Sequence, residues 1–389
     1  MSSSRDVTNA LKKLTLLFAV AFAVLCTCGP PLTRGLMRGR ADNPLSNWRP
    51  GRDAGGIAYV GTKTCAGCHT REAATYANAP MSHASAASGD CEILKSRTPL
   101  TFREGPYTYQ ITRRGEQSIY TVTDATGTIS EPILYCFGQG VAGQTYILRH
   151  GDALYEGRVS FFKKLDGLGI TILHPREVPA SLANAVGRRM SPEGARGCFA
   201  CHTTAAVAGS QLKLEQLTNG VSCEACHGPG ERHVVAARAK NFKELEIFNP
   251  GTLDALDLTQ EFCGKCHVSF EDVLQMPEQG GAGNIRFQPY RLLKSRGHLS
   301  NDRRISCVAC HDPHGELKTE PEFYDSKCTA CHLNGPRELK TKERAAAACP
   351  VSTRRCVTCH MPKVELPEMH FKFTDHWIRT PRPNEPTPK

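Results

Sequence analysis

The chain has 389 residues, enough for two or three ordinary domains, and modest hydrophobic and aromatic contents of 40% and 7%. Its formal net charge of +10 would by itself favour an acidic partner or a nucleic acid. Cysteine is the unusual residue, since fourteen of the nineteen cysteines fall in seven copies of the pattern C-x-x-C-H. Chance would produce roughly 0.04 copies in a chain of this composition. The pattern therefore marks a repeated site.

C-x-x-C-H is the attachment signal of c-type haem. The two thiols add to the vinyl groups of the haem, and the histidine ligates the iron from one face. Structural zinc sites and redox dithiols also use C-x-x-C, but zinc would need paired units and gives no role to a histidine after each one. We therefore predict seven covalently attached haem c groups. The attaching cysteines are Cys65, Cys68, Cys198, Cys201, Cys223, Cys226, Cys263, Cys266, Cys307, Cys310, Cys328, Cys331, Cys356 and Cys359, and the ligating histidines are His69, His202, His227, His267, His311, His332 and His360.

Seven haems would change the net charge of the protein and would leave few residues to enclose each haem. With two ionised propionates, each haem carries about −1 when ferric and about −2 when ferrous, so the loaded protein has roughly +3 or −4. This excludes nucleic-acid binding and predicts that many lysines and arginines pair with propionates. Between Cys198 and His360 there are only about 27 residues per haem, too few to enclose each haem in a conventional core. We therefore expect a mainly α and irregular fold packed around haem, and a largely unfolded haem-free protein.

The N-terminus combines basic residues with an apolar run from Leu14 to Cys26. This pattern predicts an export signal in residues 1–28, and the run is short for a membrane span of about 20 residues. No clear cleavage site follows, so a retained membrane anchor stays open, while Cys26 and Cys28 fit a lipidation signal poorly. Bacterial haem c is attached outside the cytoplasmic membrane, so we expect a periplasmic or other extracytoplasmic protein. Residues 29–56, rich in Pro, Gly and Arg, indicate a linker.

The segments that follow alternate between haem motifs and other structure. Residues 57–95 carry the first motif and a helical pattern at residues 71–84. Residues 96–180 contain no motif and predict a small β-rich insert. In this insert, period-two alternation predicts one hairpin from residues 107–112 and 118–123, and a second from residues 145–149 and 153–155. We expect the insert to be a shield or a docking surface rather than a catalytic domain.

The remaining segments are dense in motifs. Residues 181–275 hold motifs two to four, and a Gly-rich joint at residues 276–300 separates them from motifs five to seven in residues 301–380. The tail, residues 381–389, is disordered by composition.

The surroundings of the motifs resemble known cytochromes. The segments Gly220–His233 and Tyr59–His69 resemble the signature of the tetrahaem cytochrome family linked to hydroxylamine oxidoreductase. Residues 307–332 resemble the doubled C-x-x-C-H module of multihaem cytochromes, and residues 373–376 resemble the closing segment of the same broad group. The resemblance covers roughly residues 57–380, with the β-rich insert fitting least well. It implies periplasmic electron transfer through closely packed haems, mostly with two axial histidines. The seven motifs depart from the family's four, so its haem packing cannot be carried over.

Eight histidines lie outside the motifs and are candidates for the second axial position. His314 and His233 follow their own motifs too closely to reach the far face of the same haem, so each is suited to a neighbouring haem. His150 lies at a predicted hairpin turn, which favours an exposed residue. The remaining candidates number as many as the motifs: His83, His174, His233, His298, His314, His370 and His376. Propionate pairing and a surface position stay open for His83, His174 and His370.

Other residues could also take part in the haem sites or in a disulfide. Asp375 could orient the imidazole of His376. Met81, Met190, Met361 and Met369 could ligate iron, although packing against the haem is their more common role. Cys91 and Cys136 could form a disulfide beside the β-rich insert, which would leave Cys349 as a free thiol.

Two functions agree with these features. The first is electron transfer between redox proteins, either other cytochromes or quinol-linked or terminal oxidoreductases. The second is an oxidoreductase that acts on a small nitrogen or sulfur compound at one haem with an open iron position. All seven motifs end in histidine and the candidates suffice to close every iron, which favours the carrier. The sequence does not identify the donor, the acceptor or the oligomeric state.

Overall fold

The computed structural model describes Leu45, residues 47–276, 282–299 and 304–332, Cys349 and residues 351–380. The chain divides into two compact units, Met1–Asn43 and Pro44–Lys389, and every described residue belongs to the second. The predicted export segment and the predicted disordered tail lie outside the described residues, and the predicted joint is described only in part. No helix in the described ranges is long and apolar enough to cross a membrane.

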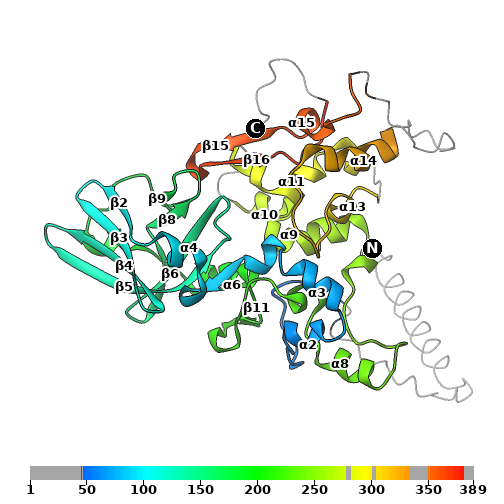
Figure 1. Cartoon of the computed structure of the whole chain (residues 1–389), viewed down its shortest axis with the longest axis horizontal. Coiled ribbons are helices and arrows are strands. Elements are labelled where there is room, and N and C mark those ends of the chain that lie inside the picture. Colours follow the sequence, from blue (N-terminus) through cyan, green and yellow to red (C-terminus); the bar gives the residue numbers. More distant parts are fainter. Residues whose placement is uncertain are drawn as a thin grey trace, which may run out of the picture. The chain divides into compact units, whose positions relative to one another are not determined.

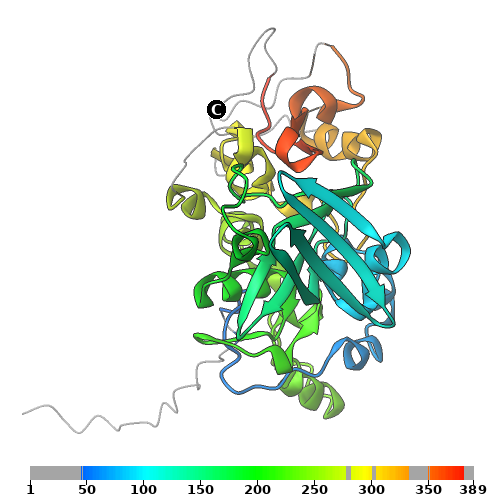
Figure 2. The same cartoon turned by 90° about the vertical axis from the view of Figure 1, so that its left-hand side faces the viewer.

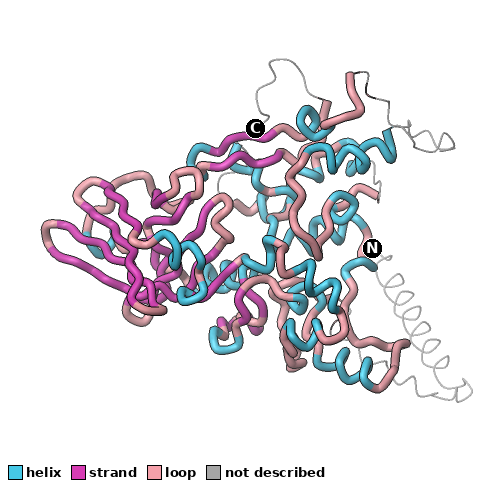
Figure 3. The backbone as a smooth tube through the Cα atoms, viewed as in Figure 1, coloured by secondary structure: helices cyan, strands magenta, loops and turns pink. Residues whose placement is uncertain are grey.

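A ten-stranded antiparallel sheet is the largest element of the described unit (Figures 1 and 3). Seven strands follow the order β10-β7-β6-β5-β4-β3-β2, while β1 pairs with β5, and β8 pairs with both β6 and β9. Figure 2 views the molecule from the side of these strands. Their bounds are β1 Ser85–Ala87, β2 Leu100–Glu104, β3 Tyr107–Arg114, β4 Gln117–Asp124, β5 Gly127–Phe137, β6 Gly143–His150, β7 Ala153–Gly157, β8 Val159–Phe162, β9 Gly167–Ile170 and β10 Gly187–Arg189.

The prediction of a mainly α and irregular fold with a small β-rich insert is therefore wrong. The sheet begins before residue 96 and ends after residue 180, and it forms a substantial layer of its own. Three of the strands that we did not predict, β1, β8 and β10, lack the alternation that reveals a half-buried strand. All four residues of β8 are buried, and the edge strands β1 and β10 have three residues each. A short or fully buried strand carries no period-two signal.

Both predicted hairpins are confirmed. Strands β3 and β4 pair so that Arg114 faces Gln117, and β6 and β7 pair so that His150 faces Ala153. Each turn contains a glycine with positive φ, +61° at Gly115 and +57° at Gly151. Glycine adopts this conformation without the steric cost that a Cβ atom would add. The turn residues and the alternation therefore agree in sequence and in structure.

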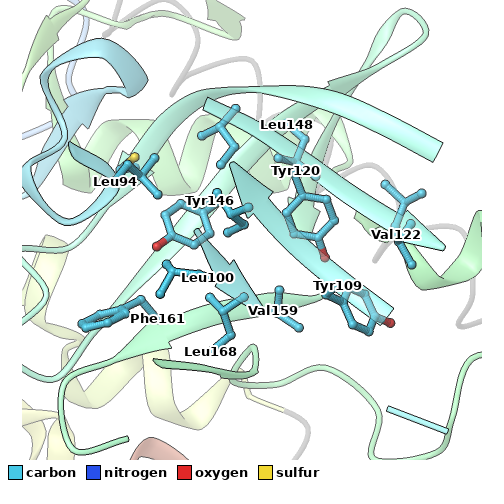
Figure 4. Packing of buried hydrophobic residues seen from close by; sticks show 14 of the residues in the cluster. Leu94, Leu100, Tyr109, Tyr120, Val122, Tyr146, Leu148, Val159, Phe161 and Leu168 are labelled. Carbon is cyan, nitrogen blue, oxygen red and sulfur yellow. The ribbon is translucent and has the colours of Figure 1, made fainter. Parts of the chain in front are cut away.

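The sheet has a hydrophobic core of closely packed side chains (Figure 4). Tyr109 and Tyr146 are fully buried and Tyr120 is nearly so. The rings of Tyr109 and Tyr120 meet edge to face with centroids 6.2 Å apart, a favourable aromatic geometry. Leu94, from the short helix α4 (Glu92–Arg97), covers the same core.

The motifs lie in short helices outside this sheet. The helices are α2 Thr62–Ala66, α3 Thr70–Tyr76, α5 Leu182–Ala185, α6 Pro192–His202, α7 Cys223–His227, α8 Glu231–Arg238, α9 Gly264–His267, α10 Phe270–Leu274, α11 Gln288–Leu293, α12 Arg296–Leu299, α13 Cys307–Cys310, α14 Pro321–His332 and α15 Cys356–His360. A π-helix, η5 Asp257–Cys263, precedes α9, and 3-10 turns are η1 Pro80–His83, η2 Ser88–Asp90, η3 Leu214–Gln216, η4 Pro250–Thr252, η6 Ala282–Arg286 and η7 Pro367–Met369. Three small ribbons pair β11 Thr203–Thr204 with β14 Thr218–Asn219, β12 Val207–Ala208 with β13 Gln211–Leu212, and β15 Lys363–Leu366 with β16 Phe371–Thr374.

The sheet meets the motif helices at the second motif. Phe137, at the end of β5, stacks on the ring of His202 with centroids 4.8 Å apart and planes 5° apart. Phe137 and Phe199 of α6 also share a buried cluster with Ile147 of β6. The sheet thereby packs against the helix that carries Cys198 and Cys201.

Candidate haem-binding site

Each motif lies on a helix or at its end, which determines where its cysteines point. Cysteines three residues apart face the same side of a helix, so both thiols of a motif can reach one ring. All fourteen motif cysteines have free thiols, and none is buried, whereas Cys91 and Cys136 in the sheet are buried. Free cysteine is among the most buried residue types. Pairs of partly exposed thiols therefore fit a group that attaches at the helix surface.

Three motif histidines face a histidine from outside the motifs. The ring centroids are 6.2 Å apart for His69 and His233, 6.0 Å for His227 and His314, and 6.2 Å for His311 and His376. A metal bonded to two imidazoles at the usual length of about 2 Å places the ring centroids about 6 Å apart. These three separations therefore match two imidazoles with one iron between them.

Hydrogen bonds at Nδ1 leave the Nε2 atoms of His227, His233 and His376 free to ligate. The Nδ1–H of His227 donates to the Phe248 carbonyl at 3.0 Å, and that of His233 donates to the Leu245 carbonyl at 2.7 Å. A backbone acceptor at Nδ1 fixes the tautomer and orients the ring of a metal-ligating histidine. Burial lowers the pKa of His227, and it lowers the pKa of His376 to about 4. Burial therefore favours the neutral form of both rings, which is the form that binds a metal.

The acceptor for His376 is the Thr374 carbonyl, 3.0 Å from Nδ1, rather than the Asp375 carboxylate. The prediction that Asp375 orients this imidazole is therefore wrong. Asp375 is fully buried and accepts two hydrogen bonds from Arg291, at 2.8 and 2.7 Å. Because these bonds hold the carboxylate toward Arg291, the aspartate contributes to the position of the C-terminal segment.

The other four candidate histidines do not face a motif histidine in any ring contact among the described residues. The Nε2 atom of the exposed His83 bonds to the Ala77 carbonyl at 2.8 Å, and that of the buried His174 lies 3.2 Å from the Glu156 carboxylate. His370 packs edge to face on Phe162 with centroids 4.9 Å apart. The Nε2 atom of His298 is buried without a hydrogen-bond partner among the described residues. A buried ring nitrogen without a hydrogen-bond partner is free to ligate a metal.

Thiols from different motifs also meet. The thiols of Cys65 and Cys223, Cys201 and Cys266, Cys263 and Cys307, and Cys328 and Cys356 lie close enough for one to shift the pKa of the other. In the first pair this contact lowers the pKa of Cys223 to about 6 and raises that of Cys65. The attachment points of the first and third, second and fourth, fourth and fifth, and sixth and seventh motifs therefore adjoin.

Two further contacts link the groups of motifs. Cys226 of the third motif and Cys263 of the fourth pack against the same buried cluster, which includes Trp48. His311 of the fifth motif meets the ring of Tyr324, on the helix of the sixth motif, with centroids 5.7 Å apart. Contacts of this kind connect all seven motifs.

Two residues that we did not predict hold the third motif in place. The indole Nε1–H of the buried Trp48 donates to the Ala225 carbonyl at 3.0 Å. The buried Glu224 accepts hydrogen bonds from the backbone near the first motif. In the sequence, Glu224 occupies one of the two variable positions of C-x-x-C-H. Because any residue is allowed there, the motif did not reveal its role.

Of the three described cysteines outside the motifs, two lie in contact with each other. Cys91 and Cys136 are buried in the sheet core, and their thiols are within hydrogen-bonding contact. The thiol of Cys91 also donates to the side-chain oxygen of Gln144 at 2.9 Å. Cys349 is exposed, and backbone hydrogen bonds from Ser352 and Val351 lower its pKa.

Comparison with known proteins agrees with this arrangement. Residues 175–228, which include the second and third motifs, match the family model for cytochrome c554 and c-prime. The chain is also 25% identical over 226 residues to the multihaem cytochrome MtrA of Shewanella baltica (strain OS185). These segments of the chain are therefore similar to multihaem c-type cytochromes. Proteins of this class transfer electrons through haem held by cysteine thioethers and axial histidines.

The comparisons cover only part of this chain. The match to MtrA spans 54% of this chain and 57% of the relative, little more than half of each. The crystal structure of the outer cell wall cytochrome OcwA is similar to 82% of this chain over 79% of its own, with 16% identity and a TM-score of 0.45.

Proposed function

We propose that this protein is a heptahaem cytochrome that carries electrons between redox partners in the periplasm or at the cell surface. Its partners are other cytochromes or quinol-linked or terminal oxidoreductases. The predicted export signal and the extracytoplasmic attachment of haem c support the location. The resemblance to the tetrahaem family linked to hydroxylamine oxidoreductase, and to the doubled motif module, stays a prediction.

The observation that carries the proposal is the set of three facing histidine pairs. Each pair joins a motif histidine to a histidine from a distant part of the chain, as in His311 with His376. We take His233, His314 and His376 as sixth ligands, and we add His298 because of its unpartnered Nε2 atom. An iron with two histidine ligands has a low potential and no open position, which suits a carrier.

The thiol contacts support an order for the electron path. We place the haems in the sequence 1-3-4-5-6-7, because the attachment sites of each successive pair adjoin. The second haem adjoins the fourth through Cys201 and Cys266, so it forms a side branch. This branch lies next to the sheet, through the stacking of Phe137 on His202.

A second candidate function is an oxidoreductase that acts on a small nitrogen or sulfur compound at an open haem. It is favoured by the hydrogen bonds at Nε2 of His83 and His174, which occupy the atom that would ligate iron. If these bonds persist in the loaded protein, fewer histidines are free than there are motifs. Such an iron would bind a substrate directly.

Electron paramagnetic resonance of the oxidised protein, with the haem number measured by mass, separates the two functions. We expect seven haems and low-spin signals only, with no binding of cyanide or nitrite. A high-spin haem that binds these ligands would contradict the pure carrier and support the oxidoreductase.

A single substitution tests the histidine pairing. His314→Met should change the low-spin signal of one haem and raise its potential, because methionine replaces one of two histidine ligands. The matched control is His150→Met, since the Nδ1 atom of His150 contacts Glu131 at 2.6 Å in the sheet. Identical spectra for both variants and the wild type would show that His314 is not a ligand.

A further inference from the structure

Glu224 is a buried carboxylate at the centre of the third motif. It is 2% exposed and lies in helix α7, directly after Cys223. Its Oε1 atom accepts hydrogen bonds from the amides of Val60 and Gly230, both at 2.8 Å. Its Oε2 atom accepts a third from the amide of Gly61, also at 2.8 Å. Three backbone donors around one carboxylate give short bonds that are stronger than those to a neutral acceptor.

These amides belong to the two segments that carry His69 and His233. Gly61 is the N-cap of α2, which leads through Cys65 to His69. Gly230 is the N-cap of α8, which presents His233 one turn later. One carboxylate therefore holds the starting points of both segments, and the two imidazoles face each other with centroids 6.2 Å apart.

The space around the carboxylate admits little change. A Cβ atom at Gly230 would lie 2.8 Å from Cγ2 of Val60 and 3.3 Å from Oε1 of Glu224, so any larger residue would push α8 away. Glutamine at position 224 would keep the volume but would present an amide donor to one of the N–H groups. Only a carboxylate of this length accepts from all three amides.

We propose that Glu224 is a positioning residue for the haem of the first motif, and that it holds His69 and His233 at the separation that two axial ligands require. This rests on the proposed function, in which these two histidines ligate one iron. Glu224 itself lies on the third motif, so the geometry at one haem is determined by the attachment helix of another. The contact of Cys65 with Cys223 has the same origin, because Glu224 binds the backbone that precedes Cys65.

The test compares Glu224→Gln with Glu231→Gln in the loaded protein. Glu231 lies nearby and accepts only one amide bond, from Ala58 at 3.1 Å, at an exposed position. By paramagnetic resonance and redox titration, we expect E224Q to keep all its haems but to shift one low-spin signal, or convert it to high spin, with a changed potential. E231Q should match the wild type.

The variant His233→Met identifies which signal belongs to this haem. E224Q should change that same signal, and in the double variant E224Q should add no further change to it, because both substitutions act on one ligand. If E224Q loses haem or fails to fold, Gly230→Ala keeps the carboxylate, displaces α8 and should shift that signal alone.

The possible failures are distinct. If E224Q, or G230A in its place, leaves that signal unchanged or alters a different haem, Glu224 is not a positioning residue, and the carrier function stands. If the wild-type protein has no signal from haem with two histidine ligands, the proposed function fails and the assignment of Glu224 fails with it.

Discussion

The sheet and the motif helices of this protein bury their side chains to different extents. The sheet contains a cluster of seventeen buried hydrophobic residues, whereas the clusters among the helices of the third to fifth motifs contain six and three in the described ranges. Burial of apolar surface is the main favourable term in folding. The sheet therefore has the means to fold by itself, whereas we expect the helices to depend on the apolar surface that bound haem would supply.

This comparison limits the expectation that the haem-free protein is largely unfolded. We now expect unfolding to be confined to the motif helices when haem attachment is prevented. Hydrogen exchange with mass spectrometry should show protection in residues 100–170 and fast exchange in residues 192–267. This is the largest effect that we predict, because it removes the structure of a whole region of the described chain.

The matched comparison is the loaded protein, in which both regions should be protected. Uniform protection in the haem-free protein would show that the helices do not need haem. Uniform loss would show that the sheet depends on its contact with the second motif, where Phe137 stacks on His202.

The sequence specifies the two regions to different degrees. The motifs identify the attachment residues directly, because covalent chemistry requires two thiols and a histidine at fixed spacing. The central hairpins were predicted from alternation and turn glycines. The short edge strands and the buried strand β8 were not, because their existence depends on pairing with residues far away in the sequence.

The same limit applies within the site. The short intervals after the third and fifth motifs indicated that His233 and His314 serve a neighbouring haem, and the structure places them across from His69 and His227. Which neighbour each one faces depends on tertiary contacts such as those of Glu224. The role of Asp375 was wrongly predicted because adjacency to His376 in the sequence does not determine the direction of its side chain.

The buried ion pair of Arg291 and Asp375 tests a second difference between the two regions. In the helical region, this pair contributes to stability where the sheet relies on hydrophobic packing. Their side chains are 1% and 0% exposed. Arg291→Met should lower the free energy of unfolding by about 3 kcal/mol, since it leaves a buried carboxylate with less compensation. Arg379, 2.7 Å from Asp375, keeps the loss near the lower end of the usual range. Guanidinium unfolding of the loaded protein measures the change.

A surface pair and a pH series provide the controls for this prediction. Lys95→Met breaks an exposed pair with Glu92 and should leave stability unchanged within error. Burial acts to raise the pKa of Asp375. The hydrogen bonds from Arg291 outweigh burial and hold this pKa below its ordinary value. The pair therefore stabilises the fold above about pH 4 and loses this effect as the pH falls through the lowered pKa. Asp375→Asn should make the free energy of unfolding less dependent on pH below about pH 4. An unchanged pH dependence would show that Asp375 is not the group that titrates.

The thiols of Cys91 and Cys136 test whether the sheet is stable independently of the motif helices. They lie in contact within its core, apart from every haem motif. In an oxidising compartment we expect them to form a disulfide that stabilises the sheet by about 2–4 kcal/mol. Mass spectrometry of the exported protein should find both sulfurs oxidised. Cys136→Ser should lower the stability of the sheet in hydrogen exchange and leave the haem spectra unchanged. Altered haem spectra would show that the two regions fold as one.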